Sequence, residues 1–151
     1  MRPDTSIYII GTQCTGKTTL VNALFNAFHG QRNDIVIHRI PEVVRTVLRE
    51  TGIMRNDITN DPWKALELQK LILRAQYEAE SKQSGTLVLS DRSGIDALVY
   101  AARYWAPGSR EMLENTREWQ YSPSRMMQSL VVLCSPHREW LVDDGTMIDA
   151  E

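Results

Sequence analysis

A glycine- and threonine-rich loop near the start of the chain separates an apolar run from an apolar-striped helical segment. Ile7 to Ile10 form the continuous apolar run, which is typical of a strand buried on both faces of a parallel sheet. After Gly16, apolar residues recur at helical spacing as far as Phe28. The order strand, glycine loop, helix therefore predicts an α/β fold that begins with a central, buried strand.

Three further short apolar segments are predicted strands, and helical patterns separate them. The strands are expected at residues 34–40, 86–91 and 129–134. Helices are expected at residues 41–51, from 61 to about 81, at 93–105 and around 111–119, whereas residues 120–128 look irregular. Alternating strands and helices imply a three-layer αβα sandwich with a mainly parallel sheet, and residues 1–151 are expected to form a single domain.

Composition narrows the partners rather than the fold. The 151 residues carry a formal net charge of -2, so there is no basic footprint, and neither nucleic acid nor a membrane surface is expected as a partner. With only two cysteines, the chain is not expected to have a disulfide framework. No segment has the pattern of a signal peptide or a membrane span. A cytoplasmic location is the resulting expectation, while the oligomeric state stays open.

The loop itself matches the phosphate-binding pattern G-x-x-x-x-G-K-[ST] from Gly11 to Thr18, in the strand-to-helix context that this pattern needs. Backbone N–H groups of such a loop, with the positive end of the next helix, bind a compound anion. Lys17 is suited to the β- and γ-phosphates and Thr18 to Mg²⁺. ATP with Mg²⁺ is the expected cofactor, and the predicted contacts are Gly11, Thr12, Gln13, Cys14, Thr15, Gly16, Lys17, Thr18 and Thr19.

Polar side chains also follow the second and third predicted strands, at the edge where ligands of parallel sheets bind. Asp91 is predicted to hold the magnesium ion or its waters, or alternatively to cap the helix near Ser93. Arg92 is either a clamp for a transferring phosphoryl group or a solvated side chain. The predicted catalytic set is Lys17, Glu42, Asp91 and Arg92, with Thr18 and Asp91 as metal ligands.

Glu42 and Arg45 lie three residues apart on a predicted helix and hence on one face. They form either a surface ion pair or a functional pair, in which Glu42 orients or deprotonates an acceptor hydroxyl and Arg45 contacts phosphate or substrate. With Arg92, these two residues are the predicted substrate contacts. Cys14 could be a redox switch, but a small side chain tolerated in the loop explains it more simply.

Four segments together resemble the NadR-type AAA domain, the kinase module of bifunctional ribosylnicotinamide kinases: GTQCTGKTTLVNAL, PEVVRTVLRE, LVLSDRSGIDALVYAARY and SLVVLCSPHREWLVDDG. The resemblance runs from about Ser6 to Gly145. It implies a P-loop, nucleoside-kinase-like fold that binds ATP and Mg²⁺ and phosphorylates a ribonucleoside-type hydroxyl of a small molecule. The positions that match the family's motifs are Lys17, Thr18, Glu42, Arg45, Asp91 and Asp144, and Asp91-Arg92-Ser93 is also similar to an element of thymidylate and deoxynucleoside kinases whose arginine handles phosphate.

One departure from the family pattern keeps other functions open. Met147 stands where the family usually has an arginine, which suggests a C-terminal truncation or a protein without efficient transfer. The alternatives are a non-catalytic nucleotide-binding or interaction module and a generic ATPase or GTPase. Asp91 to Gly94 fits a GTPase-like Asp-x-x-Gly element, but no Asn-Lys-x-Asp guanine reader follows SLVVLC, and 151 residues leave little room for the lid of a ring-forming AAA+ motor.

Overall fold

Four parallel strands form the centre of the molecule in the computed structural model, which describes residues 6–31, 36–83, 86–104 and 107–140. The strands are β1 (Ser6–Ile10), β2 (Ile37–Ile40), β3 (Leu87–Asp91) and β4 (Leu130–Leu133). They run side by side in the order β2-β3-β1-β4. Ile7 of β1 pairs with Leu89 on one side and with Leu130 on the other. The predicted parallel sheet is confirmed, and the strand before the glycine loop is an inner strand.

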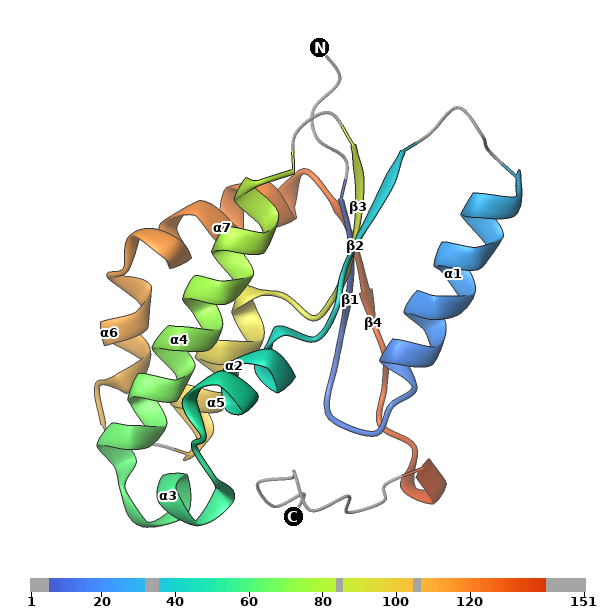
Figure 1. Cartoon of the computed structure of the whole chain (residues 1–151). Helices are drawn as coiled ribbons and strands as arrows, with labels where there is room; N and C mark the ends of the chain where they lie inside the picture. Colours follow the sequence, from blue (N-terminus) through green and yellow to red (C-terminus); the bar gives the residue numbers. More distant parts are fainter. Residues whose placement is uncertain (1–5, 32–35, 84–85, 105–106, 141–151) are drawn as a thin grey trace.

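Helices cover both faces of this sheet (Figure 1). On one face lies α1 (Lys17–Gln31), and on the other lie the remaining helices. These are α2 (Val43–Thr51), α3 (Arg55–Asn60), α4 (Pro62–Ser81), α5 (Gly94–Tyr104), α6 (Ser109–Glu114) and α7 (Arg117–Met127). A 3₁₀ turn, η1 (Arg138–Trp140), follows β4 in the chain. The three-layer αβα sandwich is therefore confirmed. No helix in the described ranges is both long and apolar enough to span a membrane.

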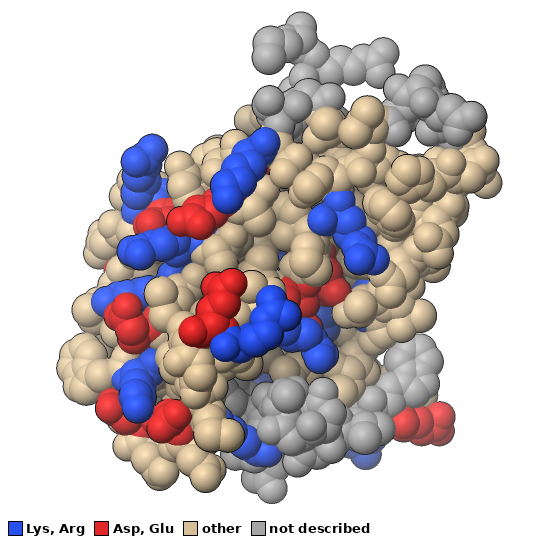
Figure 2. Space-filling model, in the orientation of Figure 1, with Lys and Arg blue, Asp and Glu red and all other residues tan. Residues whose placement is uncertain are grey.

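Two apolar clusters hold the layers together. The smaller one joins the sheet to α1 and includes Ile9, Val21 and Leu89. The larger one includes residues from each helix from α2 through α6 and is centred on the buried side chains of Leu66 and Leu73 of α4. Each fully buried side chain of this size contributes about 1.5–3 kcal/mol, so these clusters dominate the stability. Charged side chains of both signs are interspersed on the face seen in Figure 2. Exposed ion pairs such as Arg110 with Glu114 add little to the free energy of unfolding.

The second predicted helix begins two residues later than expected. Pro41 was predicted to be its first residue, but α2 starts at Val43 and Glu42 occupies the N-cap position with φ −59° and ψ 102°. The reason is the sheet, because Ile40 is still paired with Ser90 of β3 and the chain leaves the strand extended. This delay places the Glu42 side chain at the carboxyl edge of the sheet.

The prediction for residues 111–128 is wrong in its helix boundaries. One helix was expected around Glu111 to Trp119, followed by an irregular stretch, yet α6 ends at Glu114 and α7 continues to Met127. Thr116 separates the two helices, since its hydroxyl accepts a hydrogen bond from Trp119 N and caps α7. Pro123 lies inside α7, and packing of α7 against α4 outweighs the hydrogen bond that proline cannot donate. The short helix α3 was not predicted at all.

Candidate nucleotide-binding site

The loop between β1 and α1 requires glycine at both ends. Gly11 has a φ of +139°, and a Cβ atom there would lie 2.4 Å from the carbonyl oxygen of Cys134 beside it. Gly16 has a φ of +77°, which other residues rarely adopt. Immediately afterwards α1 begins at Lys17, so the unpaired N–H groups of its first turn belong to this loop. A glycine turn thus leads directly into the N-terminus of a 15-residue helix, an arrangement that binds anions in proteins generally.

Lys17 is buried within the loop. Its Nζ donates hydrogen bonds to the carbonyl oxygen of Thr12 and to Thr15 Oγ1, the latter at 3.2 Å, and Thr15 Oγ1 donates to Thr12 O at 2.9 Å. Burial, followed by the nearby positive charge of Arg92, lowers the pKa of Lys17 below its ordinary value. The Lys17 ammonium group is thus bound to oxygen atoms of the loop, and the oxygens of a bound phosphate can replace them as its hydrogen-bond acceptors.

Asp91 lies against the loop and is bound to Thr18. The Thr18 hydroxyl donates to Asp91 Oδ2 at 2.5 Å, while the buried Oδ1 has no hydrogen-bond partner among the described residues. Burial raises the pKa of Asp91, because a carboxylate without water or full pairing is disfavoured. The alternative of a cap for α5 is not supported, since Asp96 rather than Asp91 accepts from Ser93 N, at 2.9 Å.

Arg92 is buried and paired with two carboxylates, so its interpretation as a solvated side chain is wrong. Its Nε donates to Glu42 Oε1 at 2.7 Å, and a terminal guanidinium nitrogen donates to Asp96 Oδ1 at 3.3 Å. Burial alone would lower the pKa of Arg92, but the Glu42 and Asp96 charges raise it above its ordinary value. Its backbone is left-handed, with a φ of +78°, which is uncommon for a residue with a side chain.

Glu42 lies between two arginines. Its Oε2 accepts from Arg45 Nε at 2.8 Å, while Oε1 accepts from Arg92. The Glu42 side chain is 11% exposed, whereas that of Arg45 is 70% exposed, so the pair reaches from the interior to the surface. Burial alone would raise the pKa of Glu42, but Arg92 and Arg45 outweigh it and hold the pKa below its ordinary value. Glu42 is therefore an ionised carboxylate at neutral pH.

These side chains meet in one cavity of about 200 Å³. Its walls are Gln13, Cys14, Thr15, Gly16, Lys17, Thr18, Thr19, Glu42, Arg45 and Arg92. Of the other predicted site residues, Gly11 and Thr12 shape the loop without lining the cavity, and Asp91 contacts it through Thr18. Asp144 and Met147 lie outside the described residues. Residues from three separate strand ends thus converge, as the sheet topology predicts.

A second, smaller cavity of about 70 Å³ shares Gln13 and Arg92 with the first. Its other walls are the apolar Val44, Leu48, Ile58, Leu68, Ile72 and Ala97 and the polar Gln69, Asp96 and Tyr100. Sequence reasoning missed these three polar residues. A signal existed for two of them: Ser93-x-x-Asp96 is a capping pattern at a helix start, and Gln69 interrupts the apolar face of α4.

A phosphate loop with a glycine at each end, at the carboxyl edge of a parallel sheet in an αβα sandwich, defines the class of P-loop nucleotide-binding proteins. Within this class, the family model described as AAA domain matches residues 6–149, so the chain belongs to that family. A solved structure described as "Crystal structure of NadR protein in complex with NR" is similar in fold, with a TM-score of 0.70 and 22% sequence identity. The alignment covers 95% of this chain but 37% of that one. No curated protein matches the sequence. The resemblance to the NadR-type AAA domain is confirmed.

Proposed function

We propose that the protein is a kinase that transfers the γ-phosphoryl group of ATP to a hydroxyl of a nucleoside-type, ribosylnicotinamide-like small molecule. The observation that carries this proposal is the position of Arg92, which lines both cavities and binds Glu42 where they adjoin. A transferase needs a phosphate site and an acceptor site that meet at a group able to handle the transferred charge. The similarity to a NadR protein solved with NR supports the choice of acceptor class.

The phosphate-binding cavity provides the donor site. The loop amides, the start of α1 and Lys17 bind the triphosphate. Thr18 and Asp91 fit Mg²⁺, because the buried and unpaired Asp91 Oδ1 is a hard oxygen ligand. The described residues contain no cluster of three or more ligating His, Cys, Asp or Glu side chains, in keeping with an ion held largely by phosphate and water. When bound, magnesium neutralises charge that develops on the phosphate oxygens.

The smaller cavity provides the acceptor site, and Glu42 directs the acceptor hydroxyl. Its apolar walls suit a flat ring, and Gln69, Asp96 and Tyr100 provide hydrogen-bonding groups. Because Glu42 is already ionised, it accepts a hydrogen bond from the hydroxyl and orients it toward the γ-phosphorus. Its lowered pKa makes it a weak base, so orientation is its main contribution. Arg92 and Arg45 stabilise negative charge on the transferring group.

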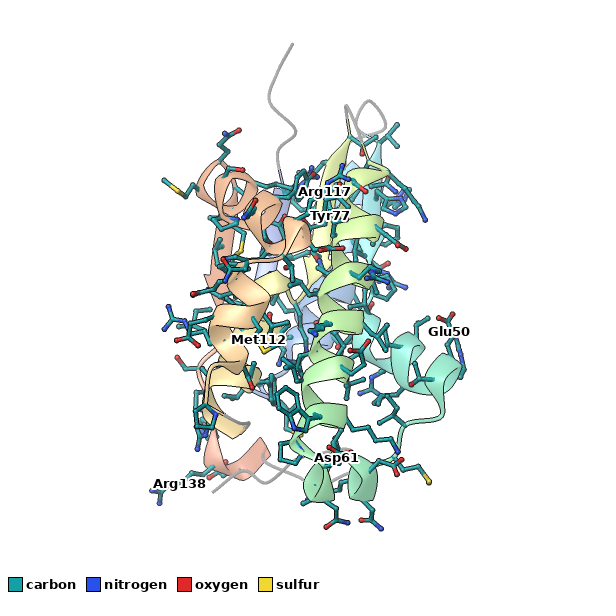
Figure 3. All side chains as sticks on the ribbon, turned by 90° about the vertical axis from the view of Figure 1, so that its left-hand side faces the viewer. Glu50, Asp61, Tyr77, Met112, Arg117 and Arg138 are labelled. Atoms are coloured by element: carbon teal, nitrogen blue, oxygen red, sulfur yellow. The ribbon has the colours of Figure 1, made fainter. Side chains whose placement is uncertain are left out.

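An assay of phosphoryl transfer from labelled ATP tests this proposal. The protein is incubated with Mg²⁺ and a panel of nucleosides that includes nicotinamide riboside, and a phosphorylated product identifies a kinase. Glu42→Gln is expected to keep nucleotide affinity but to lower kcat by about a hundredfold, since it removes the charge that orients the hydroxyl. Glu50→Gln, at the exposed far end of α2 (Figure 3), is the matched control and should leave kcat unchanged. Tight ATP binding with no product from any acceptor would eliminate the kinase.

A nucleotide-binding module without transfer is the second candidate. Its supporting observation is that each Glu42 oxygen already accepts a hydrogen bond from an arginine, so an acceptor hydroxyl has only the remaining lone pairs to bind. This candidate predicts saturable ATP binding without phosphoryl transfer. Thermal-shift titrations with ATP and GTP also separate the ATP-binding from the GTP-binding alternative, because only the preferred nucleotide raises the midpoint strongly.

A further inference from the structure

A chain of buried hydrogen bonds leads from the helix layer to the backbone of Arg92. Tyr8 Oη donates to Glu80 Oε2 at 2.8 Å, and Gln76 Nε2 donates to Glu80 Oε1 at 2.7 Å. Gln76 Nε2 also donates to Ser90 Oγ at 3.0 Å, and Ser90 Oγ donates to the carbonyl oxygen of Arg92 at 2.9 Å. None of the four linking side chains is more than 2% exposed. Neither Gln76 nor Ser90 lines a described cavity of the site.

The backbone that this chain reaches is strained. A left-handed conformation is unfavourable for a residue with a Cβ and persists only where the surroundings enforce it. At Arg92 both backbone polar groups are held, because its N–H donates to Ile9 O at 2.9 Å and its carbonyl accepts from Ser90. The left-handed residue turns the chain between β3 and α5, and from this turn the guanidinium reaches Glu42 and Asp96.

We propose that Ser90 and Gln76 are positioning residues, which hold the left-handed backbone of Arg92 so that its guanidinium stays against Glu42 at the junction of the two cavities. The use of the Ser90 proton supports this role. A hydroxyl has one proton to donate, and Ser90 donates it to the Arg92 carbonyl, whereas the buried Oε1 of Gln76 has no partner among the described residues. Gln76 Nε2 already donates to Ser90 Oγ, so the Ser90 proton is directed to the Arg92 carbonyl and not to Gln76.

The opposite end of the network has a different task. Arg125 of α7 lies 3.6 Å from Glu80 and donates to Tyr121 Oη at 2.6 Å. Close by, α4 and α7 also meet through Tyr77 and Arg117, whose guanidinium lies 6.0 Å from the Tyr77 ring (Figure 3). These contacts connect α7 to α4 and the sheet, and none of them involves Arg92. Tyr8→Phe therefore removes one hydroxyl from the same buried network without breaking the link to Arg92.

Two measurements on Ser90→Ala, with Tyr8→Phe as the matched control, test the positioning role. The first is hydrogen exchange of the Arg92 Nε–H by NMR, with the signal identified by its loss in Arg92→Lys. Ser90→Ala is expected to accelerate this exchange by about tenfold or more, because the guanidinium then leaves Glu42 more often. Tyr8→Phe should leave the exchange rate unchanged while lowering the thermal midpoint. This readout needs no activity and therefore stands apart from the proposed kinase.

The second measurement is kinetic and rests on the proposed function. Ser90→Ala is expected to lower kcat by about tenfold or more with the KM for ATP held within about twofold, since the phosphate loop is intact and only the junction is displaced. Ser90→Thr, which keeps the hydroxyl, should restore kcat. A wild-type protein without transfer activity would overturn the kinase alone, and the exchange rates would still decide the positioning role.

Three results would overturn the inference. One is a Ser90→Ala protein whose Arg92 exchange rate matches that of wild type. Another is a Tyr8→Phe protein whose Arg92 exchange accelerates as much as that of Ser90→Ala, which would make the network a general stabiliser. If Ser90→Ala does not fold, Gln76→Met tests the same link, with acceleration of Arg92 exchange again expected. Failure of both to fold would show that the link serves folding rather than positioning.

Discussion

Lys17 and Glu42 line the same cavity, yet the fold shifts their pKa values for different reasons. For Lys17, burial and the neighbouring Arg92 act in the same direction and lower the pKa. For Glu42, burial acts against ionisation, but the two arginines outweigh it and the pKa falls. The cavity therefore holds an ionised carboxylate within a group of cations, a charge arrangement in which cations can face phosphate while the carboxylate faces a hydroxyl.

Lys17→Ala is predicted to abolish stabilisation by nucleotide. In the wild-type protein, ATP with Mg²⁺ at about a hundred times its Kd should add about 2.7 kcal/mol to the free energy of unfolding. Loss of the ammonium group removes the one flexible cation of the loop, so the variant should show no resolvable shift. Differential scanning fluorimetry measures this, and Lys82→Ala, an exposed change at the end of α4, should keep the full shift. An equal shift in all three proteins would remove Lys17 from the site.

Ionisation of Glu42 is predicted to stabilise the folded protein at neutral pH. Because its pKa is lower in the folded state than in the unfolded state, this stabilisation is fully present above the unfolded-state value of about 4.3 and is lost as the pH falls through the lowered value. Asp91 and Glu80 act in the opposite sense, since burial raises their pKa values and their ionisation costs stability as the pH rises. The total pH profile is therefore mixed.

Comparison with Glu42→Gln isolates the contribution of this residue. At pH 7 the variant should be about 2 kcal/mol less stable, because Arg92 loses a charged partner in a buried position. The difference from wild type should shrink as the pH falls below about 4.3. Chemical denaturation at several pH values measures it. A difference that stays constant with pH would show that the Glu42 charge does not carry the effect.

Among the elements, α4 has the clearest start signal, and the structure shows why. Asp61 occupies its N-cap, where Oδ1 accepts from Trp63 N at 2.9 Å and from Lys64 N at 3.2 Å, and Pro62 fills the first helical position. These residues act locally, so the sequence alone predicted this start correctly. The helix then continues for 20 residues and carries Gln69 toward the smaller cavity and Gln76 toward Ser90.

Asp61→Ala is predicted to destabilise the protein by about 1 kcal/mol, the usual cost of losing an N-cap carboxylate. Asn60→Ala, one residue earlier at the exposed end of α3, should change the stability by less than about 0.5 kcal/mol. Urea denaturation of both variants measures the difference. Equal effects of the two substitutions would mean that the cap does not contribute.

The errors at α2, α6 and α7 share one physical cause. Helical periodicity in the sequence reports which residues face the core, but it does not report where an extended strand or a side-chain cap stops the helix. Ile40 keeps the chain extended through its pairing with Ser90, and Thr116 starts a new helix within a continuous pattern. Pro123 signals a break, yet the contact of α7 with α4 keeps the segment helical.

At the level of the complete fold, the segment after β4 closely approaches the end of β1. Cys134 N donates to Ile10 O at 2.8 Å, which draws the segment after β4 against Gly11. The Cys134 carbonyl oxygen fills the space in which a Gly11 side chain would lie. The start of the phosphate loop is therefore held from the side by the residue that follows β4, the neighbouring strand of the sheet, far along the chain.

Gly11→Ala is predicted to destabilise the protein by more than about 2 kcal/mol, because the new methyl group meets backbone rather than a flexible side chain and the φ of +139° is strained. Gly30→Ala is the matched control. Its Cβ would meet nothing within 4 Å near the end of α1, so this substitution should raise the stability by about 0.5–1 kcal/mol. Thermal unfolding of the two variants provides the test, and a stable Gly11→Ala protein would contradict the close approach of Cys134.

Much of the site was predictable because its parts are local in sequence. The phosphate loop needs one strand, one glycine turn and one helix, and all three lie within residues 6–31. Glu42, Arg92 and Asp91 were predicted from their positions after strands, and the structure brings all three to the same edge. Their assigned roles in catalysis and metal binding stay predictions. Gln69, Asp96 and Tyr100 were missed, because only the packing of α4 against α5 turns them toward a common cavity.

Short-range patterns in the sequence predict the layered α/β fold, the phosphate loop and the edge of the sheet at which polar residues gather, because such patterns encode strands, helices and glycine turns. The sequence did not reveal that Arg92 is left-handed and buried, that it binds Glu42 across 50 positions, or that Ser90, itself bound by Gln76, donates to its carbonyl oxygen. Burial, charge pairing and backbone strain depend on neighbours that packing brings together, and a linear sequence does not specify the distances between them.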